Sequence, residues 1–433
     1  MKALIISLES FQKGIIPEEV KQYILSQHGD IFTILDESSK IKTNNPCAET
    51  KKSKRTQAIM RLNKIGERCI LTGTFMSKSP VNAYDQMKFL SADFFKENMF
   101  AFAEHYEIRR TLPSVRGARI LLAQDDYEAI HKRLMKSRGD KYVLAGAIDK
   151  ICSYYGISRD DCVHIMKHED YTPFKNIDEL WERIGDVCFH PKKEDLLDVP
   201  PKIYKSCKVE LTKEQLKLYL ALQNQHCTDN ITVDNGLKLY IRFQDICNGY
   251  EPVSLGEDED GHETVELVPL KENPKLDLLE ELVEDIGDEQ VVVWCSRTRL
   301  LNDACQRLRD KGYSCGIYDG KVGAKQREQD YEDFFAKKIQ ILFANQTSAG
   351  FGLDKLRNAN YAIYLCNDAS VEKRQQSEDR CCRGIYTGNK YMIDLTCEGT
   401  VEDRVAEALK QGKELLDTGI TNASIFKLGG NYA

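Results

Sequence analysis

The apolar residues of this chain first form three short runs near its start. ALIISL (3–8), IFTIL (31–35) and RCILTGT (68–74) each lead into small or polar residues. The segments between the runs are long enough to be crossover helices, and strands that are apolar on both faces are typical of parallel sheets. The pattern therefore predicts three buried parallel strands in this part of the chain.

The same alternation returns from Asn273 onward. Five runs are predicted to be strands, namely VVVWCS (291–296), YSCGIY (313–318), KIQILFA (338–344), NYAIYL (360–365) and YMIDLT (391–396). Between them lie stretches of helical periodicity, such as residues 299–312 and 327–338. Regular repetition of strand and helix predicts an α/β fold with an open parallel sheet that helices cover on both faces.

The middle of the chain has a different pattern. From about 93 to 190, aromatic and basic residues recur at helical spacing with few signs of strands, which predicts a helical insert. Another helix is expected at 211–225, where Thr212 and Gln215 have the spacing of a capping box. The acidic stretch 256–266 is poor in apolar residues and is predicted to be a solvated loop or hairpin.

Composition narrows the class of protein. Of the 433 residues, 42% are hydrophobic and 30% are charged, and no apolar stretch approaches the roughly 18 residues that a membrane span needs. The net charge of -7 argues against a uniformly basic nucleic-acid binder, although a single cleft could still be basic. The fifteen cysteines are scattered without a C-x-x-C pair, which favours reduced thiols over a zinc site or disulfides. Because the first residues lack the cleavage site of a secretory signal, we expect a cytoplasmic protein of a bacterial or phage-infected cell, with no membrane partner.

An acidic pair, Asp36 and Glu37, directly follows the second apolar run. Ligands of open parallel sheets bind just beyond the carboxyl ends of the strands. One carboxylate of such a pair could hold Mg²⁺ and the next could orient an attacking water against a bound phosphate. The alternative is a strand that simply ends in polar residues.

Two further stretches carry groups that suit phosphates. In QQSEDRCCRG (375–384), Gln376, Arg380 and Arg383 stand at i, i+4 and i+7, so a helix would place an amide and two guanidinium groups on one face. An exposed charged helix face is the alternative. QTSAGFGLD (346–354) follows a predicted strand, and its small residues would let backbone N–H groups approach a ligand closely, although a tight turn would look the same.

Taken in order, these stretches resemble the Swi/Snf class of superfamily 2 helicase-like ATPases, which translocate on double-stranded DNA. DESSKIK (36–42) stands where the acidic box of that family would be, and LTGT (71–74) looks like its third motif. The other stretches that resemble family motifs are 79–90, the inter-lobe link at 191–219, 241–250, and the second-lobe motifs at 273–283, 291–297, 318–328, 346–354, 376–383 and 399–410. The resemblance as a whole covers nearly all of the chain and is less plain around 110–175.

The resemblance implies two RecA-like parallel-sheet lobes separated by a helical insert. The expected segments are 1–92 for a partial first lobe, 93–190 for the insert, 191–272 for the inter-lobe linker and helical protrusion, and 273–433 for a complete second lobe. It also implies that the protein is a nucleotide-binding hydrolase that uses ATP and Mg²⁺ and binds DNA.

The resemblance assigns roles to individual residues. Asp36 would coordinate Mg²⁺ through water, Glu37 would orient the attacking water, and Arg380 and Arg383 with Gln376 would reach the phosphates from the second lobe. Gly352 and Asp354 would contact the nucleotide. The residues that would contact DNA are Ser296, Arg297, Thr347, Lys40, Lys42 and Thr72. Basic side chains at 51–64 and at Arg109, Arg110, Arg116 and Arg119 could add contacts to DNA phosphates, and solvated helix faces are the alternative for them.

The chain departs from the family pattern in two places. Its glycine loop reads AGFGLD, where the family has a longer version that ends in asparagine. No G-x-x-x-x-G-K-[ST] phosphate loop occurs in the 433 residues, and an acidic pair cannot replace the cations and N–H groups of that loop. A separate chain or fragment that carries the phosphate loop is therefore expected to dock beside the run at 68–74, where the sheet would otherwise have an open edge.

Three functions remain open from the sequence. The first is the larger part of a DNA-dependent ATPase motor that is active only with a phosphate-loop segment. The second is a non-hydrolysing remnant that binds DNA or a protein. An RNA helicase is a third, less favoured because the linker and the closing helix resemble the duplex-DNA class. Movement along a duplex does not imply that the strands are separated.

Overall fold

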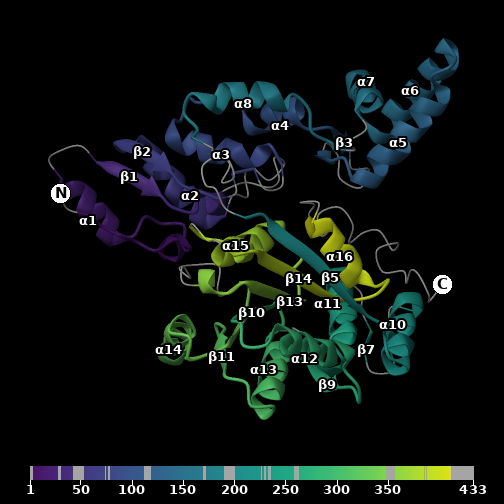
Figure 1. The fold of residues 1–433 in the computed structure, drawn as a ribbon. Helices are drawn as coiled ribbons and strands as arrows, with labels where there is room; N and C mark the ends of the chain where they lie inside the picture. Colours follow the sequence, from purple (N-terminus) through teal and green to yellow (C-terminus); the bar gives the residue numbers. More distant parts are fainter. Residues whose placement is uncertain are drawn as a thin grey trace. The chain divides into compact units, whose positions relative to one another are not determined.

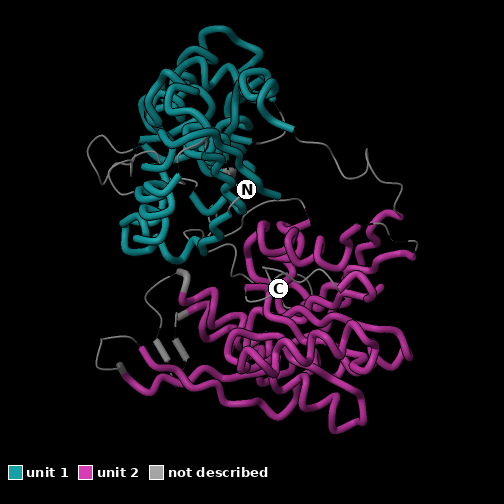
Figure 2. Tube along the Cα trace, turned by 90° about the vertical axis from the view of Figure 1, so that its left-hand side faces the viewer, with its two compact units in different colours: residues 1–190 teal, residues 191–433 magenta. Residues whose placement is uncertain are grey.

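The chain forms two compact units, residues 1–190 and 191–433 (Figure 2). The structure is a computed structural model, and each unit is described by itself. The residues that the structure describes are 3–27, 31–41, 53–73, 75–76, 79–111, 119–168, 172–189, 200–225, 227–228, 231–232, 236–257, 263–347, 356–384, 386 and 388–410.

A six-stranded parallel sheet forms the centre of the second unit (Figure 1). Its strands, in spatial order, are β11 (Cys315–Tyr318), β12 (Ile341–Ala344), β10 (Val291–Cys295), β13 (Tyr361–Cys366), β14 (Lys390–Cys397) and β5 (Lys202–Val209). Every neighbouring pair in this order is parallel. The five strands predicted from Asn273 onward are confirmed. The edge strand β5 was not predicted, because the segment 191–272 was assigned to a linker and a helical protrusion.

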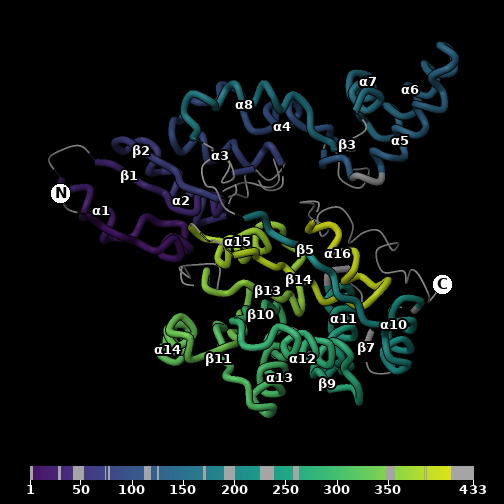
Figure 3. The backbone as a smooth tube through the Cα atoms, viewed as in Figure 1, coloured from purple at the N-terminus to yellow at the C-terminus, as the bar shows by residue number. Residues whose placement is uncertain are grey.

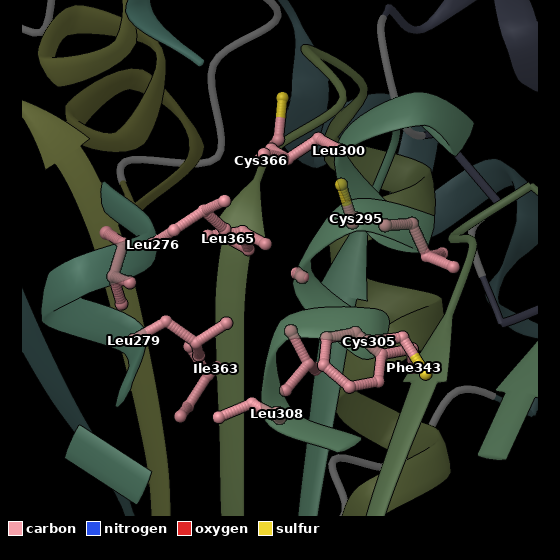
Figure 4. Close-up of a cluster of buried hydrophobic side chains, with 14 of the residues drawn as sticks. Leu276, Leu279, Cys295, Leu300, Cys305, Leu308, Phe343, Ile363, Leu365 and Cys366 are labelled. Atoms are coloured by element: carbon pink, nitrogen blue, oxygen red, sulfur yellow. The ribbon is translucent and has the colours of Figure 1, made fainter. Parts of the chain in front are cut away.

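Side chains bury the central strands of this sheet on both faces, which explains why β10, β12 and β13 are almost unbroken apolar runs. In β10, Val291, Val293 and Cys295 pack with α12 (Pro274–Ile286) and α13 (Thr298–Asp310) on one face. Figure 4 shows this layer, where Leu279 and Leu308 of the two helices meet strand residues. Val292 and Trp294 point to the opposite face, which α14 (Ala324–Phe335), the 3-10 turn η5 (Leu356–Asn358) and α15 (Val371–Cys381) cover.

A third core lies beside the carboxyl end of β14. It joins α10 (Lys213–Gln225), α11 (Gly236–Cys247) and α16 (Val401–Lys410). The predicted capping box of α10 is confirmed, since the Thr212 N–H donates to Gln215 Oε1 at 3.0 Å and the Gln215 N–H donates to Thr212 Oγ1 at 3.2 Å. Two hairpins complete the unit, β6–β7 (Cys227–Thr228 and Ile231–Thr232) and β8–β9 (Tyr250–Glu257 and Glu263–Pro269), and the second one flanks the acidic stretch.

The parallel sheet of the first unit has two strands among the described residues, β1 (Phe32–Leu35) and β2 (Glu67–Ile70). These two predicted strands are confirmed. The prediction of a strand at residues 3–8 is wrong, since 3–7 form no regular element and the 3-10 turn η1 (Leu8–Phe11) follows. Gly66 enters β2 with φ +57°, and a Cβ there would collide with the carbonyl oxygen of Ile31, so the close approach of the two strands requires glycine.

One face of this small sheet is covered and the other is not. Leu35, Ile59 and Phe89 belong to a core formed with α2 (Lys54–Met60) and the 3-10 turns η2 (Ser38–Ile41) and η4 (Arg61–Lys64). On β1, Phe32 and Ile34 remain 62% and 57% exposed. Parallel strands are normally buried on both faces, so this sheet has an apolar surface without a cover among the described residues. The short helix α1 (Glu18–Ser26) precedes β1.

The helices described in the predicted insert (93–190), together with α3 just before it, form two groups (Figure 3). The first group, α3 (Val81–Leu90), α4 (Met99–Tyr106) and α8 (Ile177–Gly185), shares an aromatic core. The second group, α5 (Gln124–Ser137), α6 (Lys141–Tyr155) and α7 (Arg159–Lys167), shares a separate core. A small antiparallel pair of strands, β3 (Arg109–Thr111) with β4 (Arg119–Leu121), lies between α4 and α5 in sequence.

The structure confirms the α/β fold class. None of the helices among the described residues is long and apolar enough to cross a membrane. Thirteen cysteines in the described part of the chain are free thiols. The four predicted segment boundaries remain predictions.

A buried ion pair connects three helices of the second unit. Lys275 Nζ, at the start of α12, lies 2.8 Å from Glu402 Oε1 of α16 and donates to Asn248 Oδ1 at 2.8 Å just after α11. Both charged side chains are almost completely buried. Burial by itself lowers the pKa of Lys275, but the Glu402 carboxylate outweighs this effect and the net pKa is raised. The lysine is therefore charged at neutral pH, and each partner depends on the other.

Replacing Lys275 with Met is expected to lower the free energy of unfolding by about 3 to 5 kcal/mol, because it leaves the Glu402 carboxylate buried without its cation. Urea denaturation measures the loss. The matched control is Lys311→Met, which removes a half-exposed ion pair with Glu280 and should cost less than about 1 kcal/mol. Equal losses of unfolding free energy in the two variants would contradict the assignment of Lys275 and Glu402 as a buried ion pair on which stability depends.

Candidate functional site

The acidic pair lies at the carboxyl end of β1, as predicted. Asp36 is exposed, and its Oδ1 accepts the backbone N–H of Glu37 at 3.0 Å. Glu37 is half-buried and has φ +53°, a left-handed conformation that costs a non-glycine residue about 1 to 3 kcal/mol. Strain of this kind persists only where the surroundings hold it, and it concentrates at functional sites.

Hydrogen bonds from β2 and α3 hold this strained turn. The Ser38 N–H donates to the Leu71 carbonyl at 3.0 Å, and the Leu71 N–H donates to the Leu35 carbonyl at 2.9 Å. The buried Ser38 hydroxyl donates to Gln86 Oε1 at 2.7 Å. The two strand ends are thus tied together, and Thr72 directly follows β2 at the same edge of the sheet.

This edge fits the chemistry of a hydrated divalent cation. Asp36 offers an exposed carboxylate, and hard cations such as Mg²⁺ prefer oxygen ligands and keep several waters. Of the neighbouring predicted DNA contacts, Lys40 is half-buried, with its N–H bonded to the Glu37 carbonyl at 2.9 Å. Lys42 lies outside the described residues.

Polar residues follow three adjacent strands of the second unit's sheet at their carboxyl ends. Ser296 comes after β10, Asn345 to Thr347 after β12, and Asn367 with Asp368 after β13. Backbone and side-chain bonds connect them: Ser296 N–H to the Cys366 carbonyl (3.0 Å), Thr347 N–H to Asn345 Oδ1 (2.9 Å), and Asp368 N–H to Gln346 Oε1 (2.9 Å). The sheet therefore ends in a polar rim where open α/β sheets bind ligands.

Two groups at this rim have unused hydrogen-bonding capacity. The buried Gln346 amide nitrogen and the Arg297 Nε have no hydrogen-bond partner among the described residues. The other end of the Arg297 guanidinium is engaged, since Nη2 donates to Gln244 Oε1 of α11 at 2.7 Å, and Gln244 in turn donates to the Asn367 carbonyl at 3.0 Å. Arg297 thus holds α11 against the sheet and keeps one donor for a ligand.

The glutamine and arginines of residues 375–384 lie on and beside α15. Gln376 and Arg380 are half-buried on the helix, one turn apart. The helix ends at Cys381, so the prediction that Arg383 shares its face is wrong: Arg383 lies beyond the helix end and is exposed. The structure places the first two side chains together, and the third follows on an exposed turn.

A buried charge network that the sequence did not reveal fixes α15. Arg374 is only 4% exposed and stacks on the Tyr364 ring at 3.5 Å. Its Nη2 lies 3.2 Å from Asp394 Oδ2 of β14, and its Nε donates to Glu378 Oε1 at 2.7 Å. Glu378 also accepts from two β5 side chains, Lys202 Nζ (3.0 Å) and Tyr204 Oη (2.8 Å).

This network keeps Glu378 ionised. Burial by itself raises the pKa of Glu378, but Arg374 and Lys202 outweigh it and the net pKa is lowered. Its stabilisation is therefore present at neutral pH and is lost as the pH falls through the lowered pKa of the folded state. One signal was present in the sequence, because Asp394 interrupts an apolar strand and a carboxylate there needs a buried partner.

Several predicted contacts lie elsewhere or cannot be described. Gly352, Asp354 and Arg116 fall outside the described residues. The insert arginines are engaged in ion pairs within their unit: Arg109 with Glu107 at 2.7 Å, Arg119 with Glu104 at 2.5 Å, and Arg110 with Asp126 at 3.3 Å. These arginines stabilise the β3–β4 region, so a structural role accounts for their charges.

The second unit also contains a group of metal-ligand types. Cys247, Cys397 and Glu402 place their ligand atoms within 4.8 Å of one another, in the buried region around Lys275. Burial raises the pKa of the Cys247 thiol well above its usual value, which keeps it protonated. The Lys275 ammonium already pairs with Glu402, so a metal cation would meet a like charge and the protonated Cys247 thiol. The group is best explained as packing around the ion pair.

Comparison with known proteins supports the assignment of the second unit. Residues 274–384, from the start of α12 to just beyond α15, match the helicase conserved C-terminal domain. The chain is 26% identical over 55% of its length to an Arabidopsis thaliana protein named as a DEAD-box ATP-dependent RNA helicase, of which it covers 36%. It is 29% identical over 34% of its length to the SWI/SNF-related matrix-associated actin-dependent regulator of chromatin subfamily A containing DEAD/H box 1 of Xenopus tropicalis, of which it covers 15%.

Among solved structures, the Sulfolobus solfataricus SWI2/SNF2 ATPase core in complex with dsDNA aligns with 94% of this chain and 74% of that chain, at 15% identity and a TM-score of 0.39. The chain thus spans about a third or less of the length of the two relatives described above. The ordered motifs, the matched C-terminal domain and the similarity to SWI/SNF-related and chromatin-remodelling proteins support a Swi/Snf-class superfamily 2 helicase-like protein.

Proposed function

We propose that the chain is the larger part of an ATP-driven motor that moves along double-stranded DNA. The observation that carries the proposal is the polar rim of the six-stranded parallel sheet beside α15, the helix that bears Gln376 and Arg380. Open sheets bind ligands at this rim, and forked guanidinium donors suit phosphates. The cytoplasm of a bacterial or phage-infected cell is the proposed location.

The proposed substrate is Mg²⁺-bound ATP, which would supply the phosphoryl group and a metal charge. Asp36 would hold the metal through water, and Glu37 would orient the attacking water from its strained turn. Arg380 and Arg383, with Gln376, contact the phosphates from the second unit. Gly352 and Asp354 are the remaining proposed nucleotide contacts.

The proposed DNA contacts are distributed over both units. Ser296 and Thr347 lie on the polar rim, and Arg297 beside them has one unused donor. In the first unit the proposed contacts are Lys40, Lys42 and Thr72. Such contacts to phosphates position a duplex without reading its sequence.

The phosphate loop comes, in this proposal, from residues outside these 433, in the same polypeptide or in another one. Phosphoryl transfer needs the N–H groups and the lysine of that loop, and no G-x-x-x-x-G-K-[ST] occurs here. The exposed Phe32 and Ile34 on the uncovered face of the β1–β2 sheet give such a segment an apolar surface to pack on.

The alternative is a non-hydrolysing protein that binds DNA or a protein partner through its second unit. The absence of the phosphate loop from the 433 residues favours it, whereas the strained Glu37 turn favours hydrolysis, since a protein that hydrolyses nothing has no use for the strain. The ATPase measurements below distinguish the two.

The chain alone is expected to show no saturable ATP turnover. Addition of a polypeptide that carries G-x-x-x-x-G-K-[ST], tested first with the product encoded directly upstream, is expected to restore it and to make it respond to duplex DNA. Phosphate release against ATP concentration, with and without duplex, measures both effects. If the chain alone showed saturable turnover, and if Glu37→Gln abolished that turnover, the need for a second segment would be refuted.

In the assembled ATPase, Glu37→Gln is expected to lower kcat about 10²- to 10⁴-fold with little change in nucleotide affinity, because the amide cannot accept a proton from water. The matched control is Glu67→Gln, which changes an exposed glutamate at the amino end of the neighbouring strand β2. Steady-state kinetics together with binding of a fluorescent ADP separates the two quantities. A similar kcat in both variants would remove Glu37 from the mechanism.

Arg380→Ala is expected to lower kcat about 10³- to 10⁵-fold, since a guanidinium that contacts the transferring phosphate stabilises charge in the transition state. Arg380→Lys keeps the charge without the fork and should recover only part of the rate. Lys325→Ala, an exposed cation on α14, serves as the control for a loss of charge in the same unit. Unchanged turnover in Arg380→Ala would place the phosphates elsewhere.

A further inference from the structure

Five cations surround the turn between α5 and α6 in the first unit. We call this surface the basic turn; its residues are Lys132, Arg133, Lys136, Arg138 and Lys141, and all of them are exposed. The segment 128–141 contains only two carboxylates, Glu128 and Asp140, in a chain whose net charge is negative. The basic turn is thus a local positive surface on an acidic protein.

The packing of α5 directs three of these cations to one side. The helix buries Tyr127, Ile130 and Leu134 in the core that it shares with α6 and α7. At 100° per residue, Lys132, Arg133 and Lys136 fall within one arc on the opposite face. Arg138 and Lys141 follow in the connection and at the start of α6, so the positive surface continues around the turn.

The cations of the basic turn differ from the other arginines of the insert in their partners. Arg109, Arg110 and Arg119 have carboxylate partners, as do Arg159 with Asp149 and Arg183 with Glu97. Within the part of the insert that the structure describes, no ion pair involves a side chain of the basic turn. Asp140, whose Oδ1 accepts the N–H groups of Tyr142 and Val143 as the cap of α6, offsets at most one of the five charges.

Helix stabilisation explains only part of this surface. Cations near the carboxyl end of a helix interact favourably with its dipole, which accounts for Lys136 and Arg138. Lys132 and Arg133 precede the last turn, and Lys141 occupies the first position of α6, where a cation is unfavourable. Beside Lys141, Tyr142 is 88% exposed and presents a phenol hydroxyl, another group that proteins use to contact phosphates.

We propose that the basic turn is a second contact site for the DNA backbone, outside the two sheet regions, which binds phosphates of a duplex without reading bases. This inference rests on the proposed function only in taking DNA as the ligand. It places a DNA contact in the insert at a position different from Arg109, Arg110 and Arg119, which are engaged in ion pairs. Each cation that neutralises a phosphate releases a counterion, so the contact has a measurable salt dependence.

The test uses the full chain and a fluorescein-labelled duplex of mixed sequence, with binding followed by anisotropy at several salt concentrations. The variant Lys132→Gln/Arg133→Gln/Lys136→Gln is expected to reduce the slope of log Kobs against log salt by about 2 to 3, which is roughly 0.9 per lost phosphate contact. The charge-preserving variant Lys132→Arg/Arg133→Lys/Lys136→Arg is expected to keep the slope of the unmodified chain.

The matched control removes three exposed cations elsewhere in the same insert, as Lys96→Gln/Lys150→Gln/Lys167→Gln. It changes the net charge equally, so it should leave the slope nearly unchanged if the contact is local. Thermal unfolding of each variant establishes that the helices are intact. Equal slopes for the unmodified chain and the basic-turn variant, or equal reductions in that variant and the control, would overturn the site while leaving DNA binding in place. Absence of salt-dependent binding by the unmodified chain would overturn both the site and the proposed DNA function.

Discussion

A parallel β-sheet has to be covered by apolar side chains on both faces, and this constraint organises both units. In the second unit, α12 and α13 cover one face and α14 and α15 cover the other, so β10 can be apolar at every position. In β10, β12 and β13, charged and amide side chains are then confined to the strand ends. The carboxyl ends of β10, β12 and β13 are adjacent, which brings Ser296, Gln346 and Asp368 to one rim. The site is thus a consequence of how the sheet is buried.

The first unit satisfies the same constraint only in part. Its described sheet has two strands, and a sheet of this size is marginal without further strands or a covering layer. The covered face carries Leu35, whereas Phe32 and Ile34 alternate onto the uncovered face. The acidic turn is nevertheless held in a strained conformation by bonds from β2 and from Gln86. Its geometry is built into the unit independently of whatever covers the sheet.

Sequence reasoning succeeded where one local pattern determines the structure. The runs from Val291 to Thr396 are apolar on both faces, and strands that alternate with helices bury such runs on both faces. It failed where the pattern is ambiguous or the partner is distant. ALIISL has a strand composition but pairs with no strand among the described residues. The edge strand β5 contains lysines, which interrupt the apolar pattern from which strands are predicted. The ion pair between Arg374 and Asp394 joins residues twenty apart on different elements, which spacing alone does not reveal.

That network also explains why the position of α15 depends on more than its own packing. Glu378 is the common acceptor for Arg374 from the helix and for Lys202 and Tyr204 from β5. It lies two residues before Arg380 on the same helix, and β5 begins directly after the segment that joins the two units in sequence. A displacement of β5 would leave a buried carboxylate short of partners, which is costly. The strand that follows the connection and the helix that carries the arginine are therefore energetically coupled through one glutamate.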